Sequence, residues 1–172
     1  MNRPVTRRIL LLLLAGAAVP AVFGLGGCAR RSTALKPPPI HYGYDVCAWC
    51  GMVINSQHFA AALAYQRNGN SRNAVFDDIG CMLAWQKAHQ DRRVLRAWVK
   101  SYATEKWVVA QQAWFVQNAA IHTPMASGIA AGATPEQARA ALPRRMRTAL
   151  RTMDYSMIRR LGSGEKNKAG EK

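Results

Sequence analysis

The N-terminus carries an export signal, so the folded part of the chain must lie after it. Three arginines, Arg3, Arg7 and Arg8, precede an apolar run from Ile9 to Leu25 that glycine and proline interrupt. A membrane-spanning helix needs about 20 consecutive apolar residues, whereas a basic segment followed by a short apolar run is typical of a signal peptide. We therefore assign residues 1–27 to a signal peptide and look for the fold beyond it.

The signal ends at a cysteine. The segment Leu25-Gly26-Gly27-Cys28 resembles the lipobox of bacterial lipoproteins, in which the cysteine thiol receives a diacylglyceryl group and becomes the mature N-terminus. Several acyl chains on one residue anchor a protein stably. We therefore expect Cys28 to be the lipidation site and the protein to be lipid-anchored on the periplasmic side of a bacterial membrane. Ala29 follows the cysteine, and the absence of Asp there resembles lipoproteins of the outer membrane.

The rest of the chain divides into a tether, one domain and a tail. Residues 28–41 include two arginines and a run of three prolines, a composition that favours an extended, flexible tether. Short strand patterns then surround short helix patterns, so we predict an α+β fold for residues 42–161. Residues 162–172 are polar and are expected to form a tail.

The first half of the domain, residues 42–101, predicts a strand–strand–helix–strand unit. Its turn signal is Asn68-Gly69-Asn70. Asp77 or Asp78 is expected to cap the helix, because carboxylates accept hydrogen bonds from the free N–H groups of the first turn. The expected elements are strands over 59–65, 74–76 and 94–99 and a helix over 79–89.

The second half, residues 102–161, repeats this pattern, and we predict two similar small ββαβ units packed together. Thr134-Pro135-Glu136 begins a helix with a cap, an early proline and an acidic first turn. Pro143 then breaks or restarts that helix. The second strand pair is expected over 107–109 and 113–116, and an apolar stripe beyond the proline over Leu142, Met146, Leu150, Met153 and Met157.

Cys47 and Cys50 form a CxxC pair. A c-type haem site is excluded, because Gly51 stands where that site needs a histidine. A zinc site needs a second pair of ligands at similar spacing, and neither Cys81 nor His89 has such a companion. A structural disulfide remains open, either between the pair or from one of them to Cys81. A membrane-tethered thiol–disulfide reductant that uses Cys47 and Cys50 also remains open.

Sulfur side chains near this pair predict a site for a soft metal. Thiolate and thioether sulfur select Cu(I). Cys50 and Met52 are two residues apart, which places them on one face of an extended segment, and Gly51 leaves room for close approach. A third sulfur must come from elsewhere in the chain. Met125, in a loop that contains proline and glycine, lacks the core-filling role of most methionines.

Several motifs in order resemble the successive landmarks of the NosL family, which are copper-binding lipoproteins accessory to nitrous oxide reductase. The similar segments are Cys47–Met52, Phe76–Met82, Trp107–Val116 and Thr123–Met125. They extend from about Asp45 to Glu136, and their combination is far more specific than any one of them.

The resemblance implies two related ββαβ units and a copper chaperone rather than an enzyme. The copper site of the family maps onto Cys50, Met52 and Met125, with Cys47 as a further participant, and the cargo is Cu(I). The expected recipient is the maturation machinery of nitrous oxide reductase, including an ABC-type transporter complex.

Three further donors stand outside this set. Cys81 and Met82 could form a second sulfur pair, but on a helix after Phe76 we expect them to be packing residues. His122 lies three residues before Met125 and is expected to be an outer or exchange ligand, not a direct one.

The C-terminal part of the domain is strongly basic, within a chain of net charge +15. Between Arg139 and Arg160 there are seven arginines and one acid, Asp154. This segment departs from the usual ending of the family. Export conflicts with nucleic-acid binding, so we expect no nucleic-acid partner. We expect a helix lying on the domain, whose basic side meets anionic lipid, an acidic partner or only solvent.

Overall fold

The computed structural model describes residues 35–148 and 150–162. The predicted signal peptide, Cys28 and much of the predicted tether lie outside the described residues, as does the tail after Gly162. Pro38 is buried and Ile40 packs against the main core, so the chain joins the domain within the range assigned to the tether. Among the described helices, none has the length and apolarity needed to cross a bilayer.

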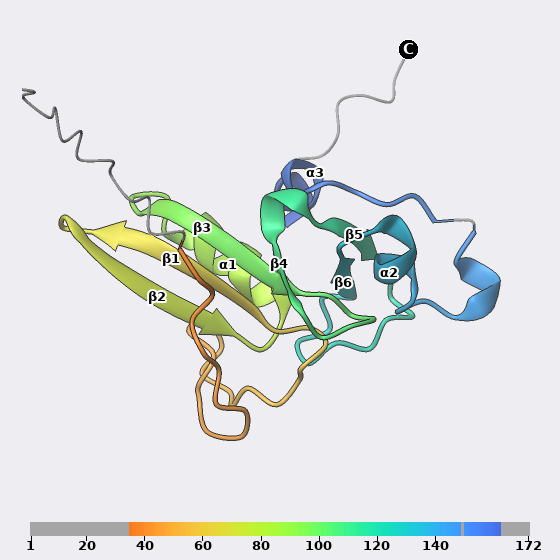
Figure 1. Ribbon diagram of the computed structural model, residues 1–172, viewed down its shortest axis with the longest axis horizontal. Coiled ribbons are helices and arrows are strands. Elements are labelled where there is room, and N and C mark those ends of the chain that lie inside the picture. The colour runs from red at the N-terminus through yellow and green to blue at the C-terminus, as the bar shows by residue number, and fades with distance from the viewer. Residues whose placement is uncertain (1–34, 149, 163–172) are drawn as a thin grey trace, which may run out of the picture. The chain divides into compact units, whose positions relative to one another are not determined.

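Four antiparallel strands form the main sheet, in the order β2-β1-β3-β4 (Figure 1). They are β1 (Ala61–Arg67), β2 (Asn70–Phe76), β3 (Arg93–Lys100) and β4 (Trp107–Val109). The Asn-Gly turn between β1 and β2 sets a hairpin register in which Arg67 lies opposite Asn70. The strand pair predicted for the first half is therefore confirmed.

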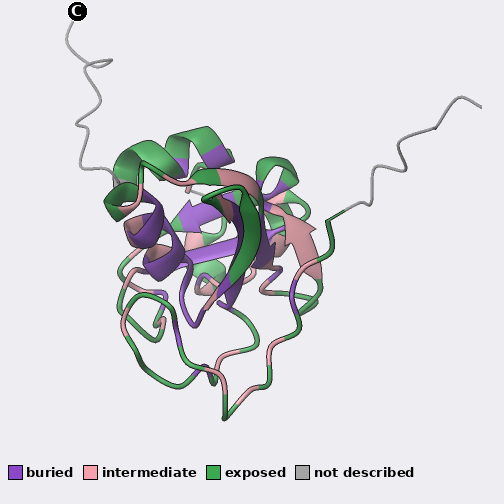
Figure 2. Ribbon diagram, turned by 90° about the vertical axis from the view of Figure 1, so that its left-hand side faces the viewer, coloured by how far each residue is buried: buried purple, intermediate pink, exposed green. Residues whose placement is uncertain are grey.

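Helix α1 (Ile79–Ala88) follows β2 after two residues and packs against β1 and β2. The Oδ1 atom of Asp78 accepts a hydrogen bond from Gly80 N at 2.7 Å, which confirms the predicted cap. Met82 and Trp85 are buried in the main core, and side chains of this size contribute about 1.5–3 kcal/mol each when fully buried. Figure 2 shows this core, with the loops mostly exposed or partly exposed around it.

The second half repeats the arrangement in a reduced form. Strand β5 (Trp114–Gln117) pairs with β6 (Ile129–Gly132), and α2 (Pro135–Arg139) packs against both strands. The last strand is reduced to one bridge, in which Phe115 pairs with Met153. β5 therefore occupies the central place that β1 has in the first unit. The predicted α+β fold with two related ββαβ units is confirmed, and the second unit is the smaller one.

Two strand pairings in the second half differ from the prediction. The segment 107–109 does not pair with β5; as β4 it extends the first sheet, with Trp98 opposite Val109. The partner of β5 is β6, whose Ile-Ala-Ala-Gly composition gives little strand signal. Met125 therefore lies in the loop between β5 and β6, not between a strand pair and a helix.

The basic segment after α2 is not one long helix, as the apolar stripe had predicted. Pro143 has an extended ψ of 141° and stops the helical path. The chain then forms the 3₁₀ turn η2 (Arg144–Met146), the bridge at Met153 and helix α3 (Tyr155–Gly162). Arg147 donates to two backbone carbonyl groups at 3.0 Å each, so it acts as a cap instead of extending a charged helical face.

Candidate metal centre

A hairpin before β1 carries the CxxC pair at its tip. Cys47 N donates to the Met52 carbonyl oxygen at 2.8 Å, and Gly51 N donates to the Cys47 carbonyl oxygen at 3.0 Å. Gly51 has a φ of +75°, a left-handed conformation that glycine adopts without steric strain. The turn therefore closes tightly between the two cysteines, Cys47 and Cys50, and brings their thiols together.

Two sets of contacts dock this hairpin onto the end of β2. Ala48 N donates to the Val75 carbonyl oxygen at 2.9 Å. On the other side of the tip, Oδ1 of Asp77 accepts from Asn55 N at 2.9 Å and from Ser56 N at 3.0 Å. Because Asp77 is buried and directly precedes the cap of α1, these bonds hold the hairpin beside the first turn of that helix.

The hairpin and α1 together form a cluster of three thiols. The Sγ atoms of Cys47, Cys50 and Cys81 all lie within 4.8 Å of one another. Cys47 and Cys81 are buried and Cys50 is partly exposed, and all three are free, so the disulfide that the sequence left open is not formed. Cys81 was expected to be a packing residue. It is buried, but its thiol faces the other two, whereas its neighbour Met82 is fully buried in the core.

The charge within the cluster is unevenly placed. The pKa of Cys47 is lowered to about 5, chiefly by the hydrogen bond from the Cys81 thiol; burial opposes this shift and nearby backbone N–H groups add to it. The same hydrogen bond, together with burial, raises the pKa of Cys81. At neutral pH, Cys47 is therefore a thiolate and Cys81 keeps its proton. A metal ion that takes Cys81 as a ligand must displace this proton.

These two shifts predict how stability depends on pH. Between pH 5 and the ordinary thiol pKa of about 8.5, the unfolded chain holds a proton on Cys47 that the folded chain has lost. The free energy of unfolding contributed by Cys47 should therefore rise across this range. Above this range, the folded chain keeps a proton on Cys81 that the unfolded chain has lost, because the pKa of Cys81 is raised. The free energy of unfolding should therefore fall as the pH rises further. Urea unfolding over pH, compared with a Cys47→Ser variant, measures the contribution, and parallel profiles for the two proteins would contradict it.

Asp78 holds the loop that carries Met125 against the same end of α1. Its Oδ2 accepts from Met125 N at 3.0 Å, and its Oδ1 accepts from Ser127 Oγ at 2.5 Å. Gly80 permits the close approach, since a Cβ there would lie 2.5 Å from the Ser127 Cβ. Asp78 is fully buried and stands three residues before Cys81. The Met125 backbone is therefore fixed to the helical turn that supplies the third thiol.

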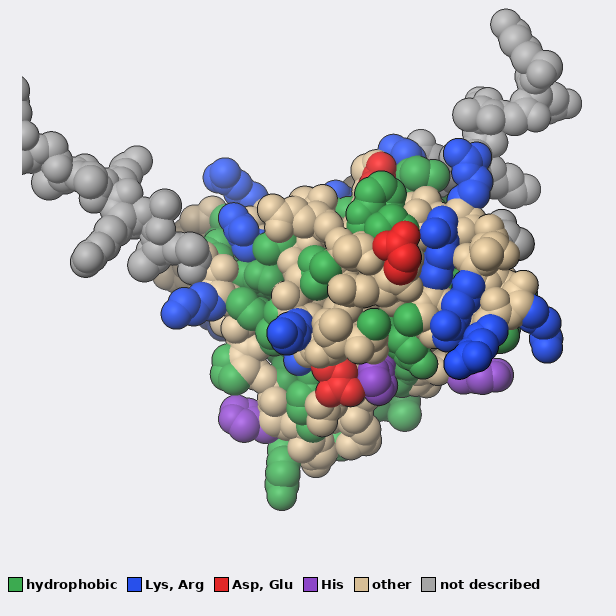
Figure 3. All heavy atoms as spheres, turned by 45° about the vertical axis from the view of Figure 1, so that its right-hand side comes forward, with side chains coloured by type: hydrophobic (Ala, Val, Ile, Leu, Met, Phe, Trp, Pro, Cys, Tyr) green, Lys and Arg blue, Asp and Glu red, His purple; other side chains and the backbone are tan. Residues whose placement is uncertain are grey.

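The two methionines predicted as ligands lie at the surface. Met52 is 53% exposed and Met125 is 41% exposed, so neither fills the core. Other exposed apolar side chains of the hairpin are Tyr44, Val46, Trp49 and Val53. Figure 3 shows hydrophobic side chains projecting at the lower end of the molecule, where the hairpin lies in Figure 1.

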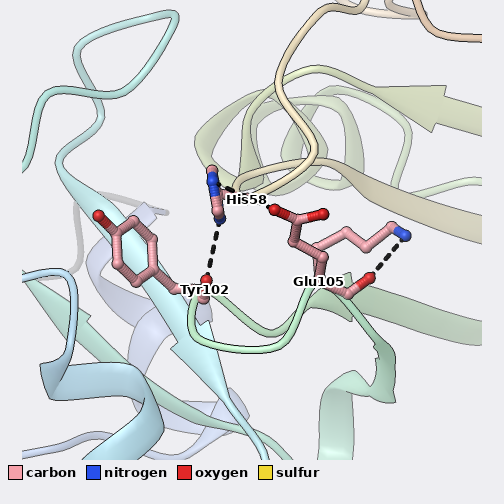
Figure 4. Close-up of polar contacts among 4 residues, drawn as sticks. His58, Tyr102 and Glu105 are labelled. Atoms are coloured by element: carbon pink, nitrogen blue, oxygen red, sulfur yellow. Dashed lines mark hydrogen bonds and ion pairs between the residues drawn. The ribbon is translucent and has the colours of Figure 1, made fainter.

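The histidines contribute little to this centre. His58 braces two loops: its Nδ1 donates to the Tyr102 carbonyl oxygen at 2.9 Å, and its Nε2 lies 3.4 Å from Glu105 Oε1 (Figure 4). Lys100 Nζ donates to the Glu105 carbonyl oxygen at 2.8 Å and ties the same turn to β3. His122, expected to be an outer ligand, is exposed in the Met125 loop.

Comparisons with known proteins agree with the motifs and the fold. A family model described as NosL matches residues 41–145, which is more than half of the chain. The chain belongs to the NosL family. Its fold resembles the crystal structure of the copper chaperone NosL from Shewanella denitrificans, with a TM-score of 0.55 and 15% sequence identity over 70% of this chain and 93% of that chain. A search of curated proteins gave no match. The resemblance to NosL proteins predicted from the sequence is confirmed.

Three residues of this NosL-family chain have larger roles than the sequence suggested. Cys81 joins the thiol cluster, and Asp77 and Asp78 were predicted only as candidates for the helix cap. A signal for all three was present, because the segment Phe76–Met82 was one of the motifs that carried the family resemblance. A family motif that spans a strand end and a helix start points to a site at that junction, where side chains of both elements meet.

Proposed function

We propose that the chain binds one Cu(I) ion as cargo at the thiol cluster and passes it on without chemical turnover. The observation that carries the proposal is the convergence of the Cys47, Cys50 and Cys81 sulfur atoms within 4.8 Å. With metal–thiolate distances of about 2.3 Å, three sulfurs around one ion would lie about 4 Å apart. The cluster therefore needs only a small contraction to hold a three-coordinate ion.

The donor set favours Cu(I) over zinc. Structural zinc sites take four ligands, chosen from Cys, His and carboxylates. The further soft donors are the thioethers of Met52, on the hairpin of the CxxC pair, and of Met125, on the loop whose backbone Asp78 holds, and thioether sulfur suits Cu(I). The acidic groups at the centre, Asp77 and Asp78, already accept backbone hydrogen bonds and are not available as ligands without breaking them.

Exposure of the methionines gives the cargo a route out. An ion held by buried thiols alone would be hard for an incoming ligand to reach. Met52 and Met125 lie at the surface and can share the ion with a recipient's donor before the thiolates release it. Because Cu(I) accepts low coordination numbers, a donor can add before another leaves.

We further infer that the recipient of the copper is the maturation machinery of nitrous oxide reductase, including an ABC-type transporter complex. We also infer that a lipid on Cys28 anchors the chain at the periplasmic side of the outer membrane. The recipient is what the resemblance of the sequence motifs to the NosL family implies, while the family model and the copper chaperone from Shewanella denitrificans support copper as the cargo. The signal-like N-terminus that ends at Cys28 supports the anchor. Mass spectrometry of the protein from membranes tests the lipid directly.

The methionine ligands can be tested by competition with a Cu(I) chelator. Met52→Ala and Met125→Ala should each weaken Cu(I) binding by the reduced protein about tenfold, because each removes one soft donor. Met157→Ala is the matched control, since Met157 is similarly exposed at 38% but lies on α3. Equal affinities for all three variants would contradict a role for the thioethers.

The competing function is a thiol–disulfide reductant. The lowered pKa of Cys47 favours it, because the thiolate is the attacking species. Burial opposes it, since Cys47 is only 2% exposed and a substrate disulfide must reach its sulfur. The methionine variants separate the two functions: a reductant would keep its reduction potential in both variants and would need no copper.

A further inference from the structure

A basic pocket lies at the far end of α1 from the thiol cluster. It has a volume of about 510 Å³ and is walled by α1, the segment before β3, and α3. Its lining includes Gln86, Lys87, His89, Arg92, Tyr155 and Arg159. Cys81 lies in the first turn of α1, whereas the pocket is lined by the helix from Leu83 onward. None of the three thiols is among the pocket's lining residues, so the two places share no side chain.

The charges that line the pocket have one sign. Among the described residues, the charged side chains that line it are Lys87, Arg92 and Arg159 and none is acidic; the exposed Asp91 carboxylate lies outside the lining, 4.0 Å from Arg92 Nε. Asp154 borders an adjoining hollow, but its carboxylate accepts from Ser156 Oγ at 2.7 Å and from Met157 N at 2.8 Å. The C-terminus of α1 carries about half a negative charge, which three full positive charges outweigh.

Aromatic rings fix the two guanidinium groups in place. The Arg92 guanidinium lies 5.2 Å from the Trp85 ring centroid and 5.5 Å from that of Tyr65. The Arg159 guanidinium lies 5.9 Å from the Tyr155 ring centroid. Guanidinium groups held on rings lose less freedom when they bind an anion than flexible ones do.

One donor of a pocket-lining side chain lacks an acceptor. Within the part of the chain that the structure describes, the buried Nε atom of Arg92 makes no hydrogen bond, and the exposed Asp91 carboxylate lies 4.0 Å away, beyond hydrogen-bonding distance. Buried N–H groups are nearly always paired with protein, water or a bound ion. Neighbouring polar groups are already paired: Tyr155 OH donates to Gln86 Oε1 at 3.0 Å, and His89 Nδ1 donates to the Trp85 carbonyl oxygen at 2.9 Å.

We propose that this pocket binds a phosphate-bearing anion. Arginine and lysine together are the side chains that recognise phosphate oxygens, and Arg92, whose Nε has no acceptor among the described residues, is one of the lining side chains. The volume is in the range of sites for small organic ligands, so the phosphate carries an organic group or is accompanied by water. The two sources of this chemistry are the headgroup of an anionic phospholipid and a soluble phosphate.

Two of the side chains that line the pocket lie beyond the segment that matches the NosL family model. The NosL family model ends at residue 145, whereas Tyr155 and Arg159 come from α3, after that point. The bridge between Phe115 and Met153 returns the chain to the domain just before α3 and so brings these two side chains over the end of α1. The basic C-terminal segment therefore closes a pocket and does not only present charge to solvent.

Calorimetric titration of the full chain tests the proposal with two probes, inorganic phosphate and water-soluble dihexanoyl phosphatidylglycerol. We expect saturable binding of one molecule per chain, weakened at least tenfold by Arg92→Gln, because a charged hydrogen bond is lost. Lys87→Gln, at an exposed position, should weaken it as well and guards against misfolding of the Arg92 variant. Tighter binding of the lipid identifies a headgroup site, and equal or tighter binding of phosphate identifies a soluble ligand.

Arg96→Gln is the matched control, since it removes the same charge from an exposed position on β3 that faces away from the pocket. It should change the affinity less than twofold. Absence of saturable binding for both probes, or an equal loss in the Arg96 variant, would overturn the proposal. Cu(I) affinity should be unchanged in all of these variants, so failure here is separate from failure of the metal site.

Discussion

Replacing Cys81 by serine should lower the Cu(I) affinity of the reduced protein roughly 100-fold. No other side chain that the sequence failed to predict as a ligand should have so large an effect. The substitution removes one of three sulfurs that lie within 4.8 Å of one another. It also removes the thiol hydrogen bond that lowers the pKa of Cys47, so one of the two remaining thiols becomes a weaker ligand at neutral pH. Competition with a Cu(I) chelator under reducing conditions measures the loss.

Met82→Leu is the control for this experiment. Met82 is the next residue of α1 and is fully buried, and a swap that conserves volume changes stability by less than about 1.5 kcal/mol. It should therefore leave the Cu(I) affinity as it is. If Cys81→Ser binds Cu(I) within twofold of the natural chain, the third thiol is not a ligand and the site consists of the CxxC pair with the methionines.

The difference between Cys81 and the other two cysteines shows what local sequence can predict about a site. Cys47 and Cys50 are near in sequence, so their spacing alone brings their thiols together. Cys81 is more than 30 positions away on a helix whose other apolar residues fill the core, and helical periodicity assigns it to packing. Its contact with the pair depends on the docking of the hairpin by Asp77, which is a tertiary interaction between backbone N–H groups and one carboxylate.

The two halves of the fold also differ in how well local sequence predicts their elements. In the first half, an Asn-Gly turn, a capping aspartate and the apolar strand β1 each give a local signal, and the turn and the cap form where they are predicted, while the polar start of β2 at Asn70 lies before the predicted strand 74–76. In the second half, β6 has only four residues, three of them Ala or Gly, and the last strand is a single residue pair at Met153. These elements exist because β5 offers unpaired edges, and sequence patterns do not record such pairing partners.

Asp78→Ala should be the most destabilising single change at the centre, with a loss of at least about 3 kcal/mol in the free energy of unfolding. The carboxylate caps α1 and accepts from Met125 N and Ser127 Oγ. Loss of a helix cap costs about 1 kcal/mol, and each donor left unsatisfied inside the protein costs about 1–3 kcal/mol. Urea unfolding measures the change. Asp91→Ala is the control, since that side chain is 78% exposed and its loss should alter stability by less than about 0.5 kcal/mol.

The same variant should weaken Cu(I) binding through the Met125 loop, and a double-mutant cycle separates this effect from general destabilisation. If Asp78 acts on the metal by holding the loop, Asp78→Ala and Met125→Ala remove the same contribution. The double variant should then have about the same Cu(I) affinity as whichever single variant binds Cu(I) less tightly. The losses in unfolding free energy should instead add in the double variant, because the cap of α1 does not involve the Met125 side chain. Additive losses in affinity would mean that the carboxylate acts on the thiols through α1, and that Met125 reaches the metal without its help.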